Sequence, residues 1–368
     1  MSRPRYIMIG GFLGAGKTTA MLQLAQRLTF AGKRVGLITN DQSIGLVDTQ
    51  MLSARDLAVE EITGGCFCCR FNSLVEAAER LSSTHAPEVF LAEPVGSCTD
   101  LKATVDYPLR RLYGDAYSVA PYSVLVDPIR AARVLGLRID KSFSEKVLYI
   151  YGKQLEEADL IIINKIDLVS DDERVELEHA LSQRFPGVGI HAISARHGTG
   201  ISDWLAALAR GVAKTTGAMK VDYDLYAEGE ALLGWLNAQF QLVAETDFDG
   251  NRFVVQLATR LSAALQDAAI ETAHLKMTLV PDEGGDLAVV NLVHSGQEPE
   301  LSHSLDAPLS KGELTLNLRA QGPPEVLREL TQRMLAIQAE ESTLRVQLKH
   351  LESFRPGRPI PTHRLAGV

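Results

Sequence analysis

The sequence predicts an α/β protein in which a doubly wound, mostly parallel sheet domain is followed by a smaller α+β domain. In the first ~215 residues, short apolar runs rich in β-branched residues alternate with longer helical patterns, which is typical of a doubly wound sheet. Beyond residue 222, strands follow one another with few helices between them, which indicates an α+β domain. The length of 368 residues fits about two domains.

The expected strands of the first domain, residues 1–215, are almost wholly apolar, as strands covered on both faces of a parallel sheet are. They are Tyr6–Ile9, Arg34–Thr39, Val89–Ala92, Ser123–Val126, Leu160–Ile163 and Gly189–Ile193. Helical patterns cover Lys17–Phe30 and Ser202–Arg210. The stretch Gly211–Lys220 loses its periodicity and is interpreted as a linker.

The second domain is expected over residues 222–352, with a ferredoxin-like arrangement as one option. Its expected strands are Leu233–Val243, His274–Pro281, Leu287–His294, Glu313–Leu318 and Leu344–Lys349. Its expected helices are Arg252–Ala269 and Pro324–Glu340. Residues 353–368 carry three prolines and three arginines, and we expect either an irregular surface segment or a free end.

Composition and charge exclude several classes of protein. The chain carries 37 basic and 46 acidic residues, a net charge of −9, so we expect no nucleic-acid partner. No apolar run approaches the ~20 residues of a membrane helix, so no membrane partner is expected. A glycine-rich segment follows the N-terminus almost at once and leaves no room for a signal peptide. We therefore expect a cytoplasmic protein.

A phosphate-binding loop is predicted where the first strand meets the first helix. Residues 11–18, Gly-Phe-Leu-Gly-Ala-Gly-Lys-Thr, fit the pattern G-x-x-x-x-G-K-[ST]. Glycines let backbone N–H groups turn toward phosphate oxygens, while Lys17 reaches the β- and γ-phosphates and Thr18 offers a hydroxyl to Mg²⁺. The expected binding residues are Gly11, Gly14, Ala15, Gly16, Lys17, Thr18 and Thr19.

Two later strand ends indicate that the nucleotide base is guanine. The run 164–167, Asn-Lys-Ile-Asp, follows a buried strand, and the Asp167 carboxylate can accept both the N1–H and the 2-amino group of guanine. Adenine offers no such pair of donors. After the next strand, a backbone N–H of the Ser-Ala pair at 194–195 can meet guanine O6. The expected base-side residues are Asn164, Lys165, Asp167, Ser194 and Ala195.

Acidic residues at strand ends are candidates for the Mg²⁺ and hydrolysis site. Glu93 ends one strand and Gly96 follows it, which provides a carboxylate near Mg²⁺ and an N–H for the γ-phosphate. Asp41 ends the second strand and can face the metal or the attacking water. Ser97 stands where many small GTPases carry a water-positioning glutamine, so slow hydrolysis is expected. The expected Mg²⁺ ligands are Thr18, Asp41 and Glu93, and the expected catalytic residues are Lys17, Asp41, Glu93 and Gly96.

A cysteine cluster lies between two of these motifs. Cys66, Cys68 and Cys69 fall within four residues after a Gly-Gly pair, a spacing that indicates metal binding or reactivity rather than disulfides. Thiolates prefer soft ions, of which Zn²⁺ is the first choice and Co²⁺ or Cu⁺ stays open. Three thiolates do not complete a tetrahedron, and the fourth ligand can be water, Glu61 or Cys98.

With these motifs, the chain resembles the CobW branch of the CobW/HypB/UreG GTPases over about residues 5–215. The resemblance is carried by residues 10–19, residues 61–69 (Glu-Ile-Thr-Gly-Gly-Cys-Phe-Cys-Cys), Glu93-x-x-Gly96 and residues 164–167. In that group a glutamate replaces the usual aspartate of the third GTPase motif, and Glu93 occupies this position. The motif reads Glu-Pro-Val-Gly here, where CobW-like proteins usually read Glu-Thr-Thr-Gly, which indicates a divergent subfamily.

The resemblance implies a P-loop GTPase domain that binds GTP and Mg²⁺, hydrolyses GTP weakly, and delivers metal ions or assists metallocofactor assembly. We therefore expect a metallochaperone whose cysteine loop is gated by the nucleotide state. Its expected partner is a client metalloprotein or a cofactor-assembly enzyme, and we expect a homodimer in the GTP state. Two alternatives stay open, a regulatory GTPase chaperone of a cofactor-dependent enzyme without metal transfer and a P-loop phosphotransferase that acts on a small molecule.

Overall fold

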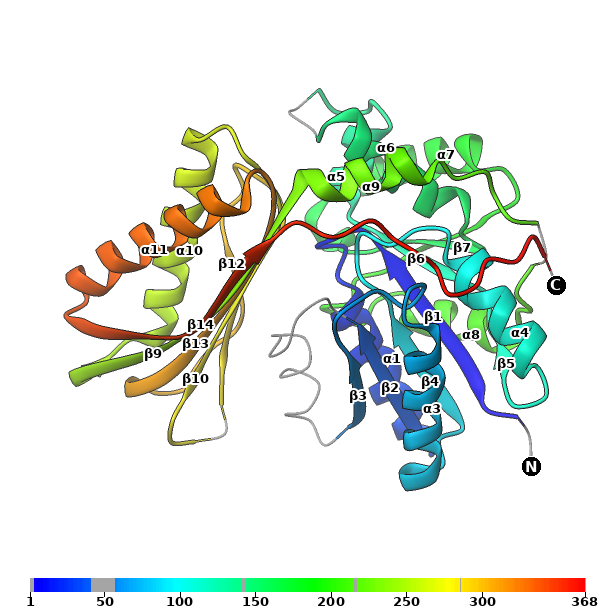
Figure 1. Cartoon of the computed structure of the whole chain (residues 1–368), viewed down its shortest axis with the longest axis horizontal. Coiled ribbons are helices and arrows are strands. Elements are labelled where there is room, and N and C mark those ends of the chain that lie inside the picture. The colour runs from blue at the N-terminus through cyan, green and yellow to red at the C-terminus, as the bar shows by residue number, and fades with distance from the viewer. Residues whose placement is uncertain (1–2, 41–56, 140–142, 215–216, 285, 368) are drawn as a thin grey trace. The chain divides into compact units, whose positions relative to one another are not determined.

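The computed structural model describes residues 3–40, 57–139, 143–214, 217–284 and 286–367 (Figure 1). The described residues fall into two compact units. The first unit runs to Ala227 and also includes the C-terminal residues from Arg358 onward, and the second unit is Glu228–Gly357. Each unit has its own sheet and its own hydrophobic core. Among the described helices, none combines the length and the apolar composition needed to cross a membrane.

The first unit contains an eight-stranded sheet in which every described strand pair is parallel, as the sequence predicts. The strand order is β3-β2-β4-β1-β6-β7-β8, and the short strand β5 pairs with β1. The strands are β1 (Arg5–Gly11), β2 (Val35–Asn40), β3 (Ala58–Ile62), β4 (Val89–Glu93), β5 (Ser118–Val119), β6 (Ser123–Val126), β7 (Leu160–Ile163) and β8 (Gly189–Ala192). The doubly wound fold class is confirmed.

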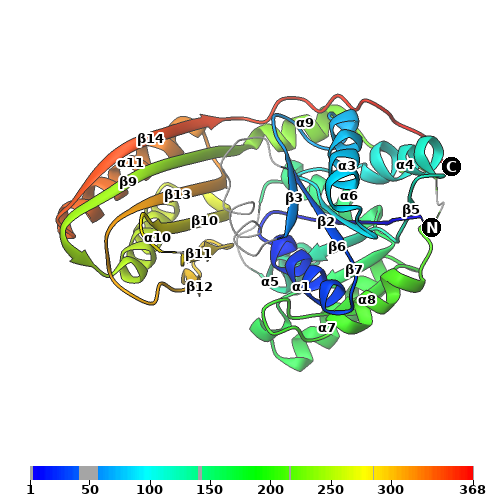
Figure 2. The same cartoon turned by 90° about the horizontal axis from the view of Figure 1, so that it is seen from below.

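Helices cover both faces of this sheet, and Figure 2 shows α1 and α8 against one face and α3 against the other. On the α1 side, Trp204 of α8 is fully buried and donates its indole N–H to Ser123 Oγ of β6 at 3.0 Å. The helices are α1 (Lys17–Phe30), α3 (Phe71–His85), a π-helical turn (Lys102–Asp106), α4 (Tyr107–Tyr113), α5 (Pro128–Val134), α6 (Glu145–Glu156), α7 (Asp171–Arg184) and α8 (Ile201–Arg210), with a 3₁₀ turn at Ile166–Leu168. The division between the two units falls within α9 (Tyr223–Leu232).

The second unit is an antiparallel six-stranded sheet with two helices. Its elements are β9 (Leu233–Phe248), α10 (Gly250–Asp267), β10 (Glu271–Pro281), β11 (Ala288–Leu292), β12 (Glu300–His303), β13 (Leu309–Gln321), α11 (Pro324–Glu341) and β14 (Leu344–Phe354). The sheet order is β12-β11-β10-β13-β9-β14. Without β11 and β12, this is the βαββαβ arrangement of a ferredoxin-like fold, with β11 and β12 extending the sheet beyond β10.

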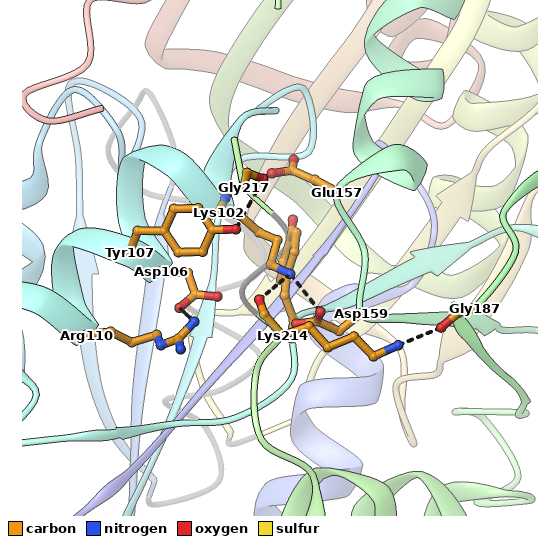
Figure 3. A network of polar contacts seen from close by, with 10 residues as sticks. Lys102, Asp106, Tyr107, Arg110, Glu157, Asp159, Gly187, Lys214 and Gly217 are labelled. Atoms are coloured by element: carbon orange, nitrogen blue, oxygen red, sulfur yellow. Dashed lines mark hydrogen bonds and ion pairs between the residues drawn. The ribbon is translucent and has the colours of Figure 1, made fainter. Parts of the chain in front are cut away.

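A network of mostly buried charged side chains includes both ends of the π-helical turn of the first unit (Figure 3). Lys102 Nζ forms an ion pair with Asp159 Oδ1 at 2.7 Å, and the Lys102 backbone N–H donates to Glu157 Oε2 at 2.9 Å. Arg110 Nη1 lies 3.8 Å from Asp106 Oδ1. Burial raises the pKa of Glu157 to about 8 and that of Asp106 to about 7, because a low-dielectric surrounding disfavours their charged forms.

Replacement of Glu157 by glutamine is expected to flatten the pH dependence of stability. The folded unit keeps the Glu157 proton up to about pH 8, whereas the unfolded chain releases it near a pKa of about 4.3. The folded state therefore binds more protons between these values, and its free energy of unfolding falls as the pH rises through this window. Glutamine mimics the protonated carboxyl group, since the Thr99 hydroxyl that donates to Glu157 at 3.2 Å can instead accept from the amide.

Urea titrations followed by the fluorescence of Trp204 measure this effect. The other tryptophan, Trp235 in β9, is replaced by phenylalanine so that the fluorescence reports on the first unit. Between about pH 5 and about pH 8, the parent should lose at least about 1 kcal/mol more stability than the Glu157→Gln variant. Parallel pH profiles for the two proteins would show that Glu157 is ionised in the folded unit.

Candidate functional site

The predicted phosphate loop lies between β1 and α1, with its backbone held by neighbouring strands. Gly16 has a φ of +85° and immediately precedes α1, so the first N–H groups of the helix face the loop. A Cβ atom on Gly16 would lie 2.4 Å from Asn164 Nδ2, so only glycine fits there. Lys17, Thr18 and Thr19 form the first turn of α1, and Lys17 and Thr18 are buried.

The candidate residues for Mg²⁺ and the γ-phosphate converge at one end of this loop. Thr18 Oγ1 donates to Glu93 Oε1 at 3.1 Å, and Lys17 Nζ lies 3.9 Å from the same oxygen. A Cβ atom on Gly96 would lie 3.0 Å from Lys17 Nζ, which places the Gly96 backbone beside the lysine ammonium group. The structure therefore brings four of the predicted residues together. Asp41, the fifth, lies outside the described residues.

The predicted base-side residues are hydrogen-bonded to the phosphate loop and to one another. Asn164 Nδ2 donates to Ala15 O at 2.9 Å, and the Ala195 N–H donates to Asn164 Oδ1 at 3.0 Å. Lys165 Nζ donates to Gly14 O at 2.6 Å. Asn164 thus joins the loop after β8 to the phosphate loop.

The candidate guanine acceptor, Asp167, sits at the edge of this network. The Ser194 hydroxyl donates to Asp167 Oδ1, so the carboxylate is held beside the loop that follows β8. Sequence reasoning missed Asp127, whose carboxylate forms an ion pair with Lys165 Nζ at 2.9 Å and accepts the Arg130 N–H at the start of α5. Its position after the buried strand β6 was the available signal, because parallel strands end at the same edge of the sheet.

The cysteine loop, residues 63–70 between β3 and α3, brings three sulfur atoms together. Cys66 Sγ lies 2.8 Å from Cys68 Sγ and 3.1 Å from Cys69 Sγ, and Cys68 Sγ lies 3.7 Å from Cys69 Sγ. Spacing alone predicts that adjacent Cys69 points away unless the backbone bends. The structure supplies the bend as a helical turn, in which the Cys69 and Arg70 N–H groups both donate to Cys66 O at 3.0 and 2.9 Å.

The ionisation of the cluster is uneven. Side-chain hydrogen bonds with Cys68, Cys69 and Cys98 hold the pKa of Cys66 well below that of an ordinary thiol. Cys68 and Cys69 each form a hydrogen bond with Cys66. This bond raises the pKa of Cys68, and it raises the pKa of Cys69 to about 11. Without metal, we therefore expect Cys66 to be the thiolate and its hydrogen-bonded neighbours Cys68 and Cys69 to stay protonated. The fully buried Cys98 reaches Cys66 from the loop after β4, which keeps it as a fourth-ligand candidate.

Asn40 positions the cysteine loop, and sequence reasoning did not assign it that role. Its side-chain amide donates to Ile62 O at 3.0 Å and to Gly65 O at 2.7 Å, while Oδ1 accepts the Phe67 N–H at 2.8 Å. Asn40 is the last residue of β2, and a polar residue that ends a buried strand was the available signal.

A known family model covers half of the chain. Residues 5–188 match the nucleotide-binding domain described as CobW/HypB/UreG. The chain belongs to the CobW/HypB/UreG family. Similarity to proteins named as zinc chaperones supports the CobW branch of this family, in agreement with the resemblance found in the motifs.

Two relatives are 27–28% identical to this family member over the segments that align. It is 28% identical over 183 residues to the zinc chaperone CobW of Sinorhizobium sp, which covers 44% of this chain and 51% of that protein. It is 27% identical over 195 residues to the zinc chaperone YeiR of Escherichia coli (strain K12), which covers 52% of this chain and 55% of that protein. The chain thus spans about half the length of these curated relatives.

Two solved structures resemble the chain only distantly. The Zn(II)-bound YjiA GTPase from E. coli is 13% identical, with a TM-score of 0.37, and the match covers 91% of this chain and 99% of that structure. HypB from Helicobacter pylori in complex with nickel is 17% identical, with a TM-score of 0.41, over 55% of this chain and 85% of that structure. TM-scores this low do not support a conclusion about the site.

Replacement of Asp167 by asparagine is expected to lower GTP affinity about 10- to 100-fold, because one charge-assisted hydrogen bond is worth about 1.5–3 kcal/mol. The amide also offers a donor to the 2-carbonyl of xanthine, so the variant should gain affinity for xanthosine triphosphate. Competition against a fluorescent GDP analogue measures both changes. Equal affinity of the unmodified protein for ATP and GTP would contradict guanine recognition by Asp167.

Proposed function

We propose that this protein binds GTP, hydrolyses it slowly, and carries a thiophilic metal ion to a client metalloprotein or cofactor-assembly enzyme. The observation that carries the proposal is the cysteine cluster, in which three thiol sulfur atoms lie within 4.8 Å of one another. This cluster belongs to the same unit as a phosphate loop with its lysine, its threonine and an acidic partner. The names of the zinc-chaperone relatives point to the same role.

The donor set fits Zn²⁺ as the metal. A Zn–S bond of about 2.3 Å in a tetrahedral site places the sulfur atoms about 3.8 Å apart. The measured separations run from 2.8 to 3.7 Å, so the sulfur atoms need to move apart by no more than about 1 Å to surround the ion. Three thiolates leave a fourth position for water or for Cys98, and an open position suits a carrier that must release its ion.

The nucleotide residues bind and orient GTP rather than attack it. Lys17 and the first N–H groups of α1 are positioned to neutralise phosphate oxygens, and Thr18 and Glu93 are positioned to hold Mg²⁺, which would screen the charge that develops on the phosphates. Ser97 is fully buried and has no amide with which to orient a water molecule. Slow turnover that increases on contact with a partner, or on dimerisation, is therefore proposed.

Zinc uptake is expected to release protons and to weaken as the pH falls. The pKa values of Cys68 and Cys69 are raised, so these thiols hold their protons at neutral pH and must lose them to bind the ion. If one or two protons leave, affinity should fall about 10- to 100-fold for each pH unit lowered. Titration of the full chain against a chromophoric chelator, with proton release followed in weak buffer, tests the proposal. Zinc affinity that does not change with pH would place the ion on ligands other than these thiols.

A further inference from the structure

The C-terminal segment, Arg358–Gly367, belongs to the first unit although it follows the second unit in sequence. Figure 1 shows it in red, crossing the first unit toward the C-terminus. Pro359 and Pro361 flank Ile360, so the chain is held extended and the Ile360 N–H is the one main-chain donor of this triplet. The Ile360 side chain is 74% exposed, so its burial does not explain why the segment lies where it does.

Backbone hydrogen bonds attach this segment to the cysteine loop. The Ile360 N–H donates to Cys69 Sγ at 3.3 Å, which makes a candidate metal ligand the acceptor. The Thr362 N–H donates to Cys68 O at 2.8 Å, and its hydroxyl donates to Cys69 O at 3.1 Å. The next residue, His363, packs edge-on against Phe71, the first residue of α3, at 5.0 Å between ring centroids.

The following residues attach the same segment to the β4 loop, residues 94–101, and to the turn after it. Arg364 Nε donates to Asp100 Oδ2 at 2.7 Å, and the Leu365 N–H donates to Ala103 O at 2.8 Å. Asp100 is 1% exposed and has a φ of +64°, in the left-handed region that few non-glycine residues adopt. The Tyr223 hydroxyl donates to the same carboxylate oxygen at 2.7 Å.

The β4 loop begins at the nucleotide site and ends at the C-terminal segment. Gly96 lies beside Lys17 Nζ, where a γ-phosphate would accept its N–H, and Asp100 is four residues further along. Gln154 holds the intervening backbone by donating to Gly96 O at 2.9 Å and to Cys98 O at 2.8 Å. A continuous series of contacts thus leads from the phosphate site to Cys69.

We propose that the C-terminal segment transmits the nucleotide state from the β4 loop to the cysteine loop. When a γ-phosphate fixes Gly96, Asp100 holds Arg364 in place, and the Ile360 N–H then holds Cys69 in the position from which it binds Zn²⁺. This inference rests on the proposed function, since it concerns how GTP changes metal affinity. The test therefore measures the effect of the bound nucleotide on zinc affinity directly.

The test compares two arginine variants of the same segment in the full chain. Arg364→Ala removes the contact with Asp100. Arg358→Ala is the matched control, because Arg358 pairs with the exposed Asp224 of α9 and does not contact either loop through that bond. Zinc affinity is measured by chelator competition with GDP and with a non-hydrolysable GTP analogue. We expect Arg358→Ala to keep the nucleotide-dependent difference, which is typically about 5- to 150-fold, and Arg364→Ala to reduce it below about 2-fold.

A second pair of variants isolates the hydrogen bond to Cys69. Ile360→Pro removes the N–H and keeps the extended backbone, whereas Ile360→Ala keeps the N–H. With the GTP analogue bound, zinc affinity should fall about 10-fold or more in Ile360→Pro and stay unchanged in Ile360→Ala, as is typical when a group that orients a metal ligand is removed.

The outcomes separate this inference from the proposed function. If the unmodified protein distinguishes the nucleotides but Arg364→Ala does so equally well, or if Ile360→Pro binds zinc like Ile360→Ala, the C-terminal segment is not the link and the proposed function stands. If the unmodified protein binds no zinc through its cysteines, both the proposed function and the inference are wrong.

Discussion

Replacement of Lys17 by alanine is expected to lower GTP hydrolysis by at least about 100-fold and to weaken triphosphate binding, because charge builds up on the β- and γ-phosphate oxygens during transfer. The Lys17 ammonium group is buried beside Gly96 and lies 3.9 Å from Glu93. A water molecule in its place would carry no positive charge, so it could not stabilise the phosphate oxygens in the same way. Phosphate release at saturating GTP measures the first effect, and competition binding measures the second.

Lys33→Ala is the matched control for this prediction. Lys33 follows α1 on the surface and pairs with Glu88 at 3.0 Å, so its loss should leave hydrolysis unchanged. Hydrolysis by Lys17→Ala at the rate of the unmodified protein would show that the phosphate loop is not the hydrolytic site. A rapid, concentration-independent rate from the unmodified monomer would contradict the expectation of slow intrinsic turnover.

Simultaneous replacement of Cys66, Cys68 and Cys69 by serine is expected to lower zinc affinity by at least about 1,000-fold, since serine hydroxyls stay protonated and do not replace thiolate ligands. Chelator competition measures the loss, and unchanged GDP binding shows that the nucleotide domain is folded. Unchanged zinc affinity in the triple variant would place the metal elsewhere and favour the regulatory GTPase without metal transfer.

A single Cys98→Ser variant addresses the fourth ligand. If water completes the site, zinc affinity should change less than about 10-fold, whereas loss of a direct thiolate ligand should cost substantially more. Cys98 forms a side-chain hydrogen bond with Cys66, which brings its sulfur atom next to the cysteine cluster. The same chelator assay distinguishes the two coordination shells.

Much of the fold follows from local patterns in the sequence. The strands Ser123–Val126 and Leu160–Ile163 and the helix Lys17–Phe30 are found with the bounds that the sequence predicts. The two strands are almost wholly buried apolar runs, and the helix buries one side of a clear helical pattern. The strand β3, Ala58–Ile62, was not predicted. Among the strands that the structure describes, it pairs with β2 alone, at the edge of the sheet, and it carries two glutamates, so it lacks the apolar signal of a buried strand.

The candidate site was predictable wherever a motif fixes the local backbone. The phosphate loop, Glu93, Asn164 and the cysteine cluster are all placed by residues close to them in sequence. The contacts that hold these parts together join distant segments, such as Asn40 with Phe67 and Ile360 with Cys69. No periodicity or spacing reports such contacts, since they depend on how the finished sheet places its loops.

Nucleotide gating of the cysteine loop can be tested by comparing the zinc affinity of the full chain in its two nucleotide states. Competition against a chromophoric chelator is carried out with GDP and with a non-hydrolysable GTP analogue, both with Mg²⁺. We expect tighter zinc binding with the GTP analogue than with GDP, by about 5- to 150-fold. By thermodynamic linkage, bound zinc should raise the preference of the protein for the GTP analogue over GDP by the same factor. Identical zinc affinity in the two states would contradict nucleotide gating of the cysteine loop, even if the cysteines bind the metal.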